Sequence, residues 1–430
     1  MTVKTIRGAR RFFFNLRVRL WVFFFFIKQV AVGALPVSKL VAVLRRLEYF
    51  LGKLQENKFV AVDGTVRLGL YIPQVATRPF ETACRKFATF GRKLNNTTVL
   101  VSVTSACRFR CEHCYQKRDH GKDVDIEHLL DAVSQIQNSG AAFFNIEGGE
   151  PFLVFDRLKA VCETIDERSE IWVNSTGDGM TEKRLRELKA LGLTAVMFPL
   201  HSHLPEKHDA FMGKAGAFEM MSQGARLCHE AGVTVAFNMC LGPRQFQDGT
   251  FEACMAEAKE KGAAYIQMIK PKAAGGWLEA GVPVFSDEDL RQVKQKVTAY
   301  NHDKTYADYP AISAQILEEA PEMFGCTAGG TDRYYLNAKG DVQPCEFLNV
   351  SFGNIKEERF IDIYNRMRTD FETPGTCWLC EQYAGRVRDI VEAKGVASLP
   401  LTPEQTARFM RDVDRGAPTE LYHTIEKKMG

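Results

Sequence analysis

The chain has 430 residues, enough for two to four domains of ordinary size. Hydrophobic residues make up 45% of it and charged residues 25%, which excludes wholesale disorder, fibrous repeats and low-complexity sequence. The net charge of +3 hides an asymmetry, because residues 1–47 contain ten Lys or Arg and no Asp or Glu, so the rest of the chain is net acidic.

The basic N-terminal segment also contains short apolar runs. The Phe-rich run 20–27 and the run 30–35 are separated by Lys28 and Gln29, and neither reaches the ~20 apolar residues that a spanning helix needs. A basic amphipathic helix is predicted next, with Leu40, Leu44, Leu47 and Leu51. This composition favours peripheral contact with the inner face of an anionic cytoplasmic membrane. Packing on the protein or on a second subunit, and an export signal, are the alternatives.

From residue 98 onward, predicted strands alternate with predicted amphipathic helices. The pattern predicts strands at 98–104, 143–146, 170–173, 195–200, 233–238 and 264–269. It predicts helices between them, at 125–137, 155–165, 182–191, 217–230 and 251–261. Six such strands imply a parallel sheet, and we predict an α/β fold, a partial (β/α)6 TIM-like barrel. Reactive groups of such barrels lie at the C-terminal ends of the strands.

Three regions are predicted. Residues 1–95 form the basic, Phe-rich, helical N-terminal region, and residues 96–302 form the barrel. Residues 303–430, where the elements become shorter, form a small α+β domain.

Seven of the twelve cysteines fall into two spaced groups. Cys107, Cys111 and Cys114 lie in one loop directly after the first predicted strand. Three thiolates can hold an iron–sulfur cluster while leaving one iron open, whereas a closed cluster or a structural zinc site needs four ligands. Thiols kept for a metal need a reducing compartment, which predicts a cytoplasmic location.

The second group provides four thiolates for one complete cluster. Its members are Cys326, Cys345, Cys377 and Cys380. Cys345 follows a predicted hairpin, and the last two cysteines close a two-residue loop. A structural zinc ion on the same four thiolates is the alternative.

Two of these motifs together carry a family resemblance. The sequence Cys107-Arg-Phe-Arg-Cys-Glu-His-Cys114, followed after the second strand by Gly148-Gly149-Glu150-Pro151, resembles the radical S-adenosylmethionine (SAM) enzymes over residues 96–275. The resemblance implies a [4Fe–4S] cluster on the three cysteines, whose open iron binds SAM. It further implies cleavage of SAM to a 5′-deoxyadenosyl radical, which abstracts hydrogen from an unactivated C–H bond.

The resemblance also implies which residues bind SAM. Gly148 and Gly149 let the backbone approach the methionine part of SAM, Glu150 accepts from its ammonium group, and Pro151 completes the motif. Asn174 and Ser175 follow the third strand, where polar residues that bind ribose or carboxylate are found in the family. No residue is predicted as the catalytic acid or base.

The C-terminal cysteines are similar to the SPASM or twitch extension of the same family. The shorter twitch form fits better, because no cysteine follows Cys380. An auxiliary [4Fe–4S] cluster is implied, which serves as electron acceptor and favours oxidation or C–C or C–S bond formation. The implied reductant is of the flavodoxin or ferredoxin type.

A lipid or other hydrophobic substrate fits the N-terminal segment, and maturation of a ribosomal peptide or protein is the alternative within this enzyme class. Residues 36–95 do not show the strand and helix alternation of a leader-peptide-binding domain, which lowers the second hypothesis. A non-catalytic Fe–S electron carrier is the alternative from another class, and it has no need of the glycine-rich motif. Nothing in the sequence indicates a nucleic-acid partner.

Overall fold

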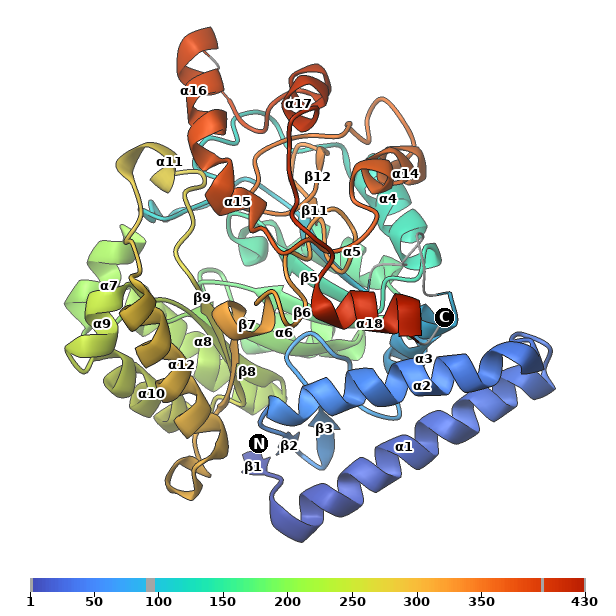
Figure 1. Ribbon diagram of the computed structural model, residues 1–430. Helices are drawn as coiled ribbons and strands as arrows, with labels where there is room; N and C mark the ends of the chain where they lie inside the picture. The colour runs from blue at the N-terminus through green and yellow to red at the C-terminus, as the bar shows by residue number, and fades with distance from the viewer. Residues whose placement is uncertain (1–2, 90–96, 396–397, 429–430) are drawn as a thin grey trace.

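The computed structural model describes residues 3–89, 97–395 and 398–428 of the chain. A nine-stranded sheet in the order β10-β9-β8-β7-β6-β5-β4-β11-β12 forms its centre (Figure 1). The parallel part consists of β4 (Thr98–Ser102), β5 (Phe143–Glu147), β6 (Glu170–Asn174), β7 (Leu193–Pro199), β8 (Thr234–Cys240), β9 (Tyr265–Ile269) and β10 (Ala311–Ala314). The six predicted strands are all present, and the α/β partial barrel is confirmed.

Helices follow the strands, as the apolar periodicity predicts. The helices between the first six parallel strands and after them are α4 (Ile126–Asn138), α5 (Phe155–Thr164), α6 (Glu182–Ala190), α7 (Pro205–Met212), α8 (Ala217–Ala231), α9 (Pro243–Gln247), α10 (Thr250–Glu260), α11 (Trp277–Ala280) and α12 (Asp287–His302). Side-chain caps fix several of their starts, since Thr181 accepts from the Arg184 amide and Ser286 accepts from that of Asp289. These helices bury leucine, valine and methionine side chains in one continuous core with the sheet.

The sheet continues into the C-terminal region. β10 extends it beyond β9, and the short strand β11 (Tyr335–Leu336) pairs in parallel with β4 and antiparallel with β12 (Val342–Gln343). The remaining helices are α13 (Gln315–Glu318), α14 (Phe360–Asp370), α15 (Leu379–Gln382), α16 (Ala384–Lys394), α17 (Pro403–Met410) and α18 (Glu420–Lys428). The predicted boundary at residue 302 is therefore crossed by hydrogen-bonded strands at both sides of the barrel.

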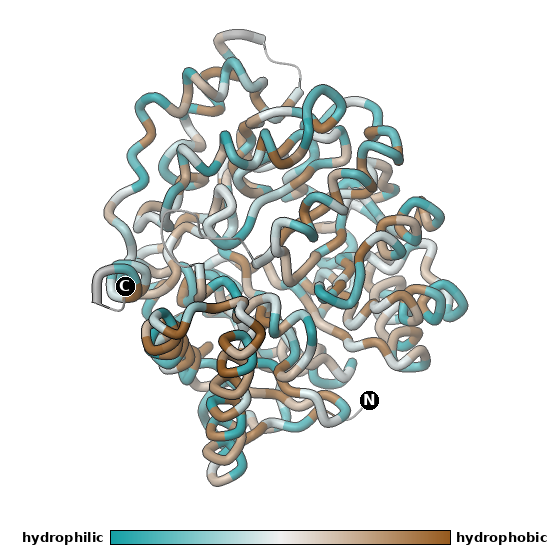
Figure 2. Tube along the Cα trace, turned by 90° about the vertical axis from the view of Figure 1, so that its right-hand side faces the viewer, coloured by the Kyte–Doolittle hydropathy of each residue, from teal (hydrophilic) through white to brown (hydrophobic). Residues whose placement is uncertain are grey.

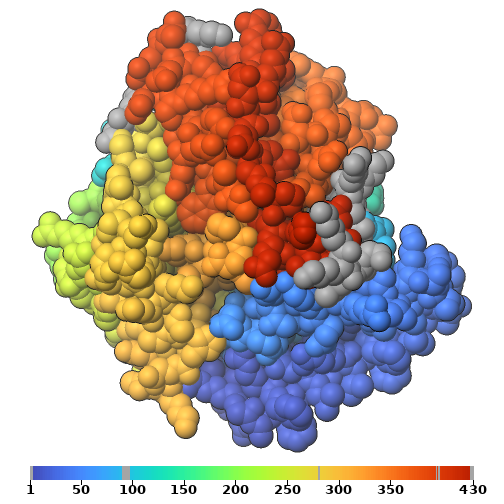
Figure 3. Space-filling view, in the orientation of Figure 1, coloured from blue at the N-terminus to red at the C-terminus, as the bar shows by residue number. Residues whose placement is uncertain are grey.

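The N-terminal region forms a helical layer along one edge of the molecule (Figures 1 and 3). It contains β1 (Val3–Thr5), α1 (Gly8–Ala31), α2 (Val37–Lys53), β2 (Val60–Val62), β3 (Thr65–Arg67) and α3 (Arg78–Arg85). The inner face of α1 is buried with α2, α3 and α18 in a second core. The predicted helical character of the N-terminal region is confirmed. The inner face of α1 packs on the protein, as the packing alternative predicts. No helix in the described ranges is long and apolar enough to cross a membrane.

A buried ion pair attaches this layer to the barrel. Arg67 of β3 contacts Glu170 at the start of β6, and both side chains are almost completely buried. The Glu170 carboxylate also accepts from the Gln74 amide, the Trp172 indole and the Thr194 hydroxyl. The antiparallel sheet β1-β2-β3, which the sequence did not predict, positions Arg67 for this contact.

Candidate active site

The loop that carries the first cysteine group is held from two sides by backbone hydrogen bonds. The Arg110 amide donates to the carbonyl of Met212 at 3.3 Å, next to the end of α7. The Gly276 amide donates to the Cys114 carbonyl at 3.0 Å, from the segment after β9. A Cβ at Gly275 would lie 2.3 Å from the same carbonyl oxygen, so only glycine permits this approach. The three cysteines thus sit on a loop that is fixed at the C-terminal edge of the barrel.

The three thiols of this loop interact electrostatically. Burial, together with the neighbouring Cys114 and Cys107 thiols, raises the pKa of Cys111 to about 12. Burial also raises the pKa of Cys114 to about 11, while Cys107 is exposed. A bound cation favours the thiolate form, so this donor set suits iron ligation. The assignment of Cys107, Cys111 and Cys114 to the cluster stays a prediction.

The glycine-rich motif packs directly on the cysteine loop. A Cβ at Gly148 would lie 2.5 Å from the Thr104 carbonyl oxygen, and one at Gly149 would lie 2.3 Å from that of Ala106. The Gly149 amide donates to Thr104 at 2.7 Å. Glycine is therefore required because two backbone segments touch here, a reason that the sequence alone does not reveal.

Glu150 of this motif is fully buried and bonded to its own chain. Its carboxylate accepts from the Phe152 amide, the Ser175 hydroxyl, and the amide and hydroxyl of Thr176, at 2.6–3.0 Å. Burial raises its pKa to about 7, and these hydrogen bonds oppose the shift. Glu150 and Ser175 thus connect the loops after β5 and β6. The expected contact of Glu150 with the SAM ammonium group stays a prediction.

A polar pocket occupies the barrel interior beside these loops. Asn145 and Glu147 of β5, Asn174 of β6 and Asn238 of β8 line it. The Oδ1 atoms of Asn145 and Asn174 are buried and have no hydrogen-bond partner within the described ranges. Two unsatisfied acceptors fit a ligand that carries donors, such as the ammonium and ribose hydroxyl groups of SAM. The structure therefore brings predicted Asn174 into the pocket.

Glu147 is a pocket residue to which the sequence analysis assigned no role. It accepts from the Tyr115 hydroxyl at 2.5 Å and from Asn174 Nδ2 at 3.0 Å. Burial raises its pKa to about 8, against the effect of both hydrogen bonds. The sequence spacing could have indicated its place in the pocket. Asn145 and Glu147 are two residues apart on one strand, so their side chains face the same side of the sheet.

The second cysteine group gathers in the C-terminal region. Cys345 lies just after β12, and Cys380 lies in α15. Burial raises the pKa of Cys345, and the neighbouring thiols of Cys380 and Cys326 raise it further. Cys377 lies two residues beyond Gly375, which forms a β-bridge with Cys326. Within the described ranges no three His, Cys, Asp or Glu side chains are arranged to hold a single metal ion, so the cluster assignment stays a prediction.

An ion-pair network connects this region to the pocket. Lys272, which lines the pocket, donates to Glu381 at 2.5 Å, and Lys270 donates to the same carboxylate at 2.8 Å. The Lys272 ammonium also lies 3.5 Å from the centroid of the Trp378 ring. Because Glu381 directly follows Cys380, the network fixes the second cysteine group relative to the end of β9.

Comparison with known proteins identifies both halves of this arrangement. The Radical SAM superfamily model matches residues 101–254, and the SPASM model of an iron–sulfur cluster-binding domain matches residues 326–381. The AdoMet-dependent heme synthase of Methanosarcina barkeri is 24% identical, over 65% of this chain and 86% of that protein. The sporulation killing factor maturation protein SkfB of Bacillus subtilis is 21% identical, over 61% and 63%.

The fold also has solved relatives. The structure of Streptococcus suis SuiB bound to the precursor peptide SuiA has a TM-score of 0.52 and 15% identity, over 69% of this chain and 73% of that one. The chain is thus a radical SAM enzyme with a C-terminal SPASM iron–sulfur domain. Its cofactors are SAM, the [4Fe–4S] cluster to which SAM binds, and an auxiliary iron–sulfur cluster.

Proposed function

We propose that this radical SAM enzyme works at the surface of an anionic membrane and abstracts hydrogen from a lipid or other hydrophobic substrate. The outer face of α1 carries the proposal. The face consists of large apolar side chains that are 40–66% exposed, namely Phe12, Phe13, Leu16, Leu20, Phe23, Phe24 and Ile27.

This outer face is distinct from the face that packs on the protein. At 3.6 residues per turn the seven exposed side chains cover an arc of about 120°. The buried residues of α1 lie on the opposite side, at Val18, Val22, Phe25 and Phe26. In Figure 2 the lower helical layer contains many residues coloured brown, the hydrophobic end of the scale. A contiguous exposed apolar stripe of this kind marks an interaction site.

Charge supports an anionic lipid surface as the partner of the outer face. The exposed side chains of Arg10, Arg17 and Lys28 lie along one edge of the stripe, and the first acidic residue of the chain is Glu48. Each such cation contributes about 1 kcal/mol near an anionic bilayer, and aromatic side chains add to this by insertion at the interface. An apolar stripe with a basic edge fits an anionic lipid surface.

The chemistry follows from the cofactors and from the residues proposed to hold them. When bound, the first cluster supplies one electron that splits SAM into methionine and a 5′-deoxyadenosyl radical, which takes a hydrogen atom from a substrate C–H bond and becomes 5′-deoxyadenosine. Cys107, Cys111 and Cys114 hold this cluster, and Asn145 and Asn174 orient SAM. The C-terminal cysteines hold an electron acceptor for oxidation or for C–C or C–S bond formation.

The remaining parts of the proposal concern location, reductant and organisation. The enzyme is cytoplasmic and peripheral at the inner face of the membrane, and a flavodoxin- or ferredoxin-type protein reduces it. Residues 1–95 form the membrane-directed region, residues 96–302 the barrel and residues 303–430 the auxiliary-cluster domain.

Peptide maturation is the second candidate function. SkfB is named as a maturation protein, and SuiB was solved bound to a precursor peptide. The strands β2 and β3 also lie in a segment in which the sequence predicted none. These strands have three residues each. Isotope transfer distinguishes the two candidates. Deuterated cell lipids are expected to deliver deuterium to 5′-deoxyadenosine, and transfer only from deuterated peptides would refute the lipid proposal.

Membrane contact is tested with vesicles. The reconstituted full chain is expected to co-sediment with anionic vesicles, weakly with neutral ones, and less at high salt. Replacing Phe12, Phe13, Phe23 and Phe24 by Ser should weaken binding at least tenfold, because each buried Phe contributes about 1.5–3 kcal/mol when fully inserted. Val284→Ser, at another highly exposed apolar residue, is the matched control. Equal binding by the fourfold variant and the wild type would refute docking through this face.

A further inference from the structure

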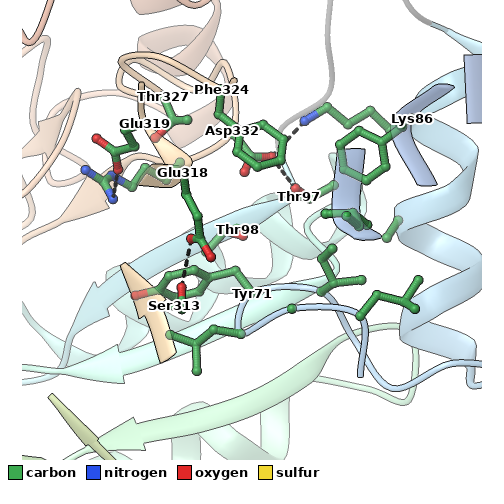
Figure 4. A pocket seen from close by; sticks show the side chains of 18 of the residues that line it. Tyr71, Lys86, Thr97, Thr98, Ser313, Glu318, Glu319, Phe324, Thr327 and Asp332 are labelled. Carbon is green, nitrogen blue, oxygen red and sulfur yellow. Dashed lines mark hydrogen bonds and ion pairs between the residues drawn. The ribbon is translucent and has the colours of Figure 1, made fainter. Parts of the chain in front are cut away.

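We propose that a second, apolar cavity is the binding site for the hydrocarbon part of the substrate. This cavity is called the lateral chamber here, and the inference rests on the proposed hydrophobic substrate. It lies across the gap between the two sides of the barrel, since Leu100 of β4 and Ser313 of β10 both line it (Figure 4). Its empty space is about 1470 Å³, part of which is open to solvent.

The walls of the lateral chamber are made largely by segments outside the two matched domains. Leu47, Phe50 and Leu51 of α2 line one side, and Leu421 and Ile425 of α18 line it beside them. Phe80 of α3 and Phe324 continue the apolar wall. The family models cover residues 101–254 and 326–381, so the parts that enclose this space are additions to the shared catalytic framework.

The lateral chamber joins the polar pocket of the active site. Six residues line both spaces, namely Tyr71, Leu100, Gln267, Ile269, Glu346 and Phe347. Tyr71 contacts Gln267 through its hydroxyl group at this junction. Glu346 and Phe347 directly follow Cys345, so the junction also adjoins the second cysteine group. A chain in the lateral chamber would therefore present its end between the SAM pocket and the auxiliary ligands.

Both cationic side chains of the wall are paired with carboxylates. Lys86 bonds to Asp332 at 2.7 Å, and Arg333 bonds to Glu319 at 2.9 Å. Glu318 accepts from Ser313 at 2.7 Å. Figure 4 marks these interactions with dashed lines. Arg333 also lies 3.8 Å from Glu346 at the junction. Because both cations of the wall already have carboxylate partners, the site suits an uncharged hydrocarbon chain rather than an anionic ligand.

The ligand class is thus an elongated, hydrocarbon-rich molecule whose reactive carbon lies at the junction. Burial of each additional methylene group strengthens binding about fourfold, from the transfer free energy of CH₂. Affinity is therefore expected to rise steeply with chain length until the lateral chamber is filled. A rigid macrocycle or a polar peptide would not show this dependence.

The test uses the reconstituted full chain and the uncharged 11-(dansylamino)undecan-1-ol as the probe, displaced by linear alcohols of increasing length. Ala83→Phe introduces a large side chain at a lining position of α3 and should weaken probe binding at least tenfold. Thr82→Phe places the same side chain one residue away, outside the lining, and should leave binding unchanged. Equal probe affinity in wild type and Ala83→Phe would overturn the proposal.

A second measurement covers the case in which Ala83→Phe fails to fold. A diazirine-bearing alkyl alcohol should label the wild-type chain within residues 68–72 or at Phe324 after irradiation. Labels confined to the outer face of α1 would overturn the proposal, as would tight binding of hemin without binding of the alkyl probe. Vesicle binding separates the two proposals, because Ala83→Phe should retain it whereas the fourfold Phe variant should lose it and still bind the probe.

Discussion

The buried pair Arg67–Glu170 offers the sharpest test of how the N-terminal layer is attached to the barrel. The perturbation is Arg67→Met, which keeps an apolar stem of similar length over the Trp172 ring and removes the charge. Arg67 and Glu170 are 4% and 3% exposed, so the remaining carboxylate would have no solvent to replace its partner. Removing one member of such a pair is strongly destabilising, by about 3–5 kcal/mol.

In the Arg67→Met variant, Glu170 can become protonated and so lose its unpaired charge. The free-energy cost of this protonation limits the destabilisation, and the cost depends on pH. From an ordinary Glu pKa near 4.3, protonating the carboxyl costs about 3.7 kcal/mol at pH 7 and about 1 kcal/mol at pH 5. Burial lowers the pKa of Arg67 to about 10, so the guanidinium group stays charged at both values. The hydrogen bond from Arg67 to the Ile72 carbonyl adds a loss of about 1 kcal/mol that does not depend on pH.

Amide hydrogen exchange in β3 and β6 measures this effect locally, without the need for two-state unfolding of the whole enzyme. After correction for intrinsic exchange rates, the opening free energy of Arg67→Met should be lower than wild type by about 4–5 kcal/mol at pH 7 and by about 2 kcal/mol at pH 5. Adding Glu170→Gln should recover most of the loss at pH 7. An equal loss at both pH values would refute the argument.

Two further predictions concern the cofactors and the pocket. Anaerobically reconstituted protein should contain about eight irons per chain and cleave SAM. Replacing Cys107, Cys111 and Cys114 by Ala should abolish cleavage and leave about four irons per chain. Metal analysis that finds one zinc and about four irons in the wild type would favour a structural zinc site. Glu147 has a pKa of about 8 in the fold, so the folded state binds a proton that the unfolded state releases above pH ~4.3, and stability falls as the pH rises. Thermal unfolding of the cofactor-free chain should show that Glu147→Gln removes about 2.5 kcal/mol of this fall between pH 5.5 and 7.5, and an unchanged slope would contradict the assignment.

The barrel was predictable because its signals are local. The helix predicted at 217–230 is α8 (Ala217–Ala231), and the strand predicted at 233–238 is β8 (Thr234–Cys240). β10 was missed because its four residues, Ala-Ile-Ser-Ala, contain no distinctive pattern and become a strand only by pairing with β9. The strands β2 and β3 have three residues each and are fixed by the same kind of tertiary contact.

The motifs of the candidate site could be predicted from the sequence, but the contacts of its individual side chains could not. Spacing placed the cysteine loop and the glycine-rich motif after successive strands, and the fold brings them into backbone contact. Sequence could not show that Glu150 would be enclosed by Ser175 and Thr176, because those donors arrive from another strand. The lateral chamber could not be predicted from the sequence either, because its lining residues come from segments more than 300 residues apart.

The sequence could not distinguish membrane contact of the N-terminal segment from packing on the protein, because α1 has a face suited to each. A helix that only packs has a single apolar face, but α1 has one face against α2 and another that is exposed. Deleting residues 1–50 would therefore be an ambiguous test of membrane contact, because it would also remove Leu47 and Phe50 from the wall of the lateral chamber. Loss of activity after such a deletion would follow from either cause. Replacement of the outer phenylalanines leaves the chamber wall intact, so only that change assigns a loss of membrane binding to the outer face.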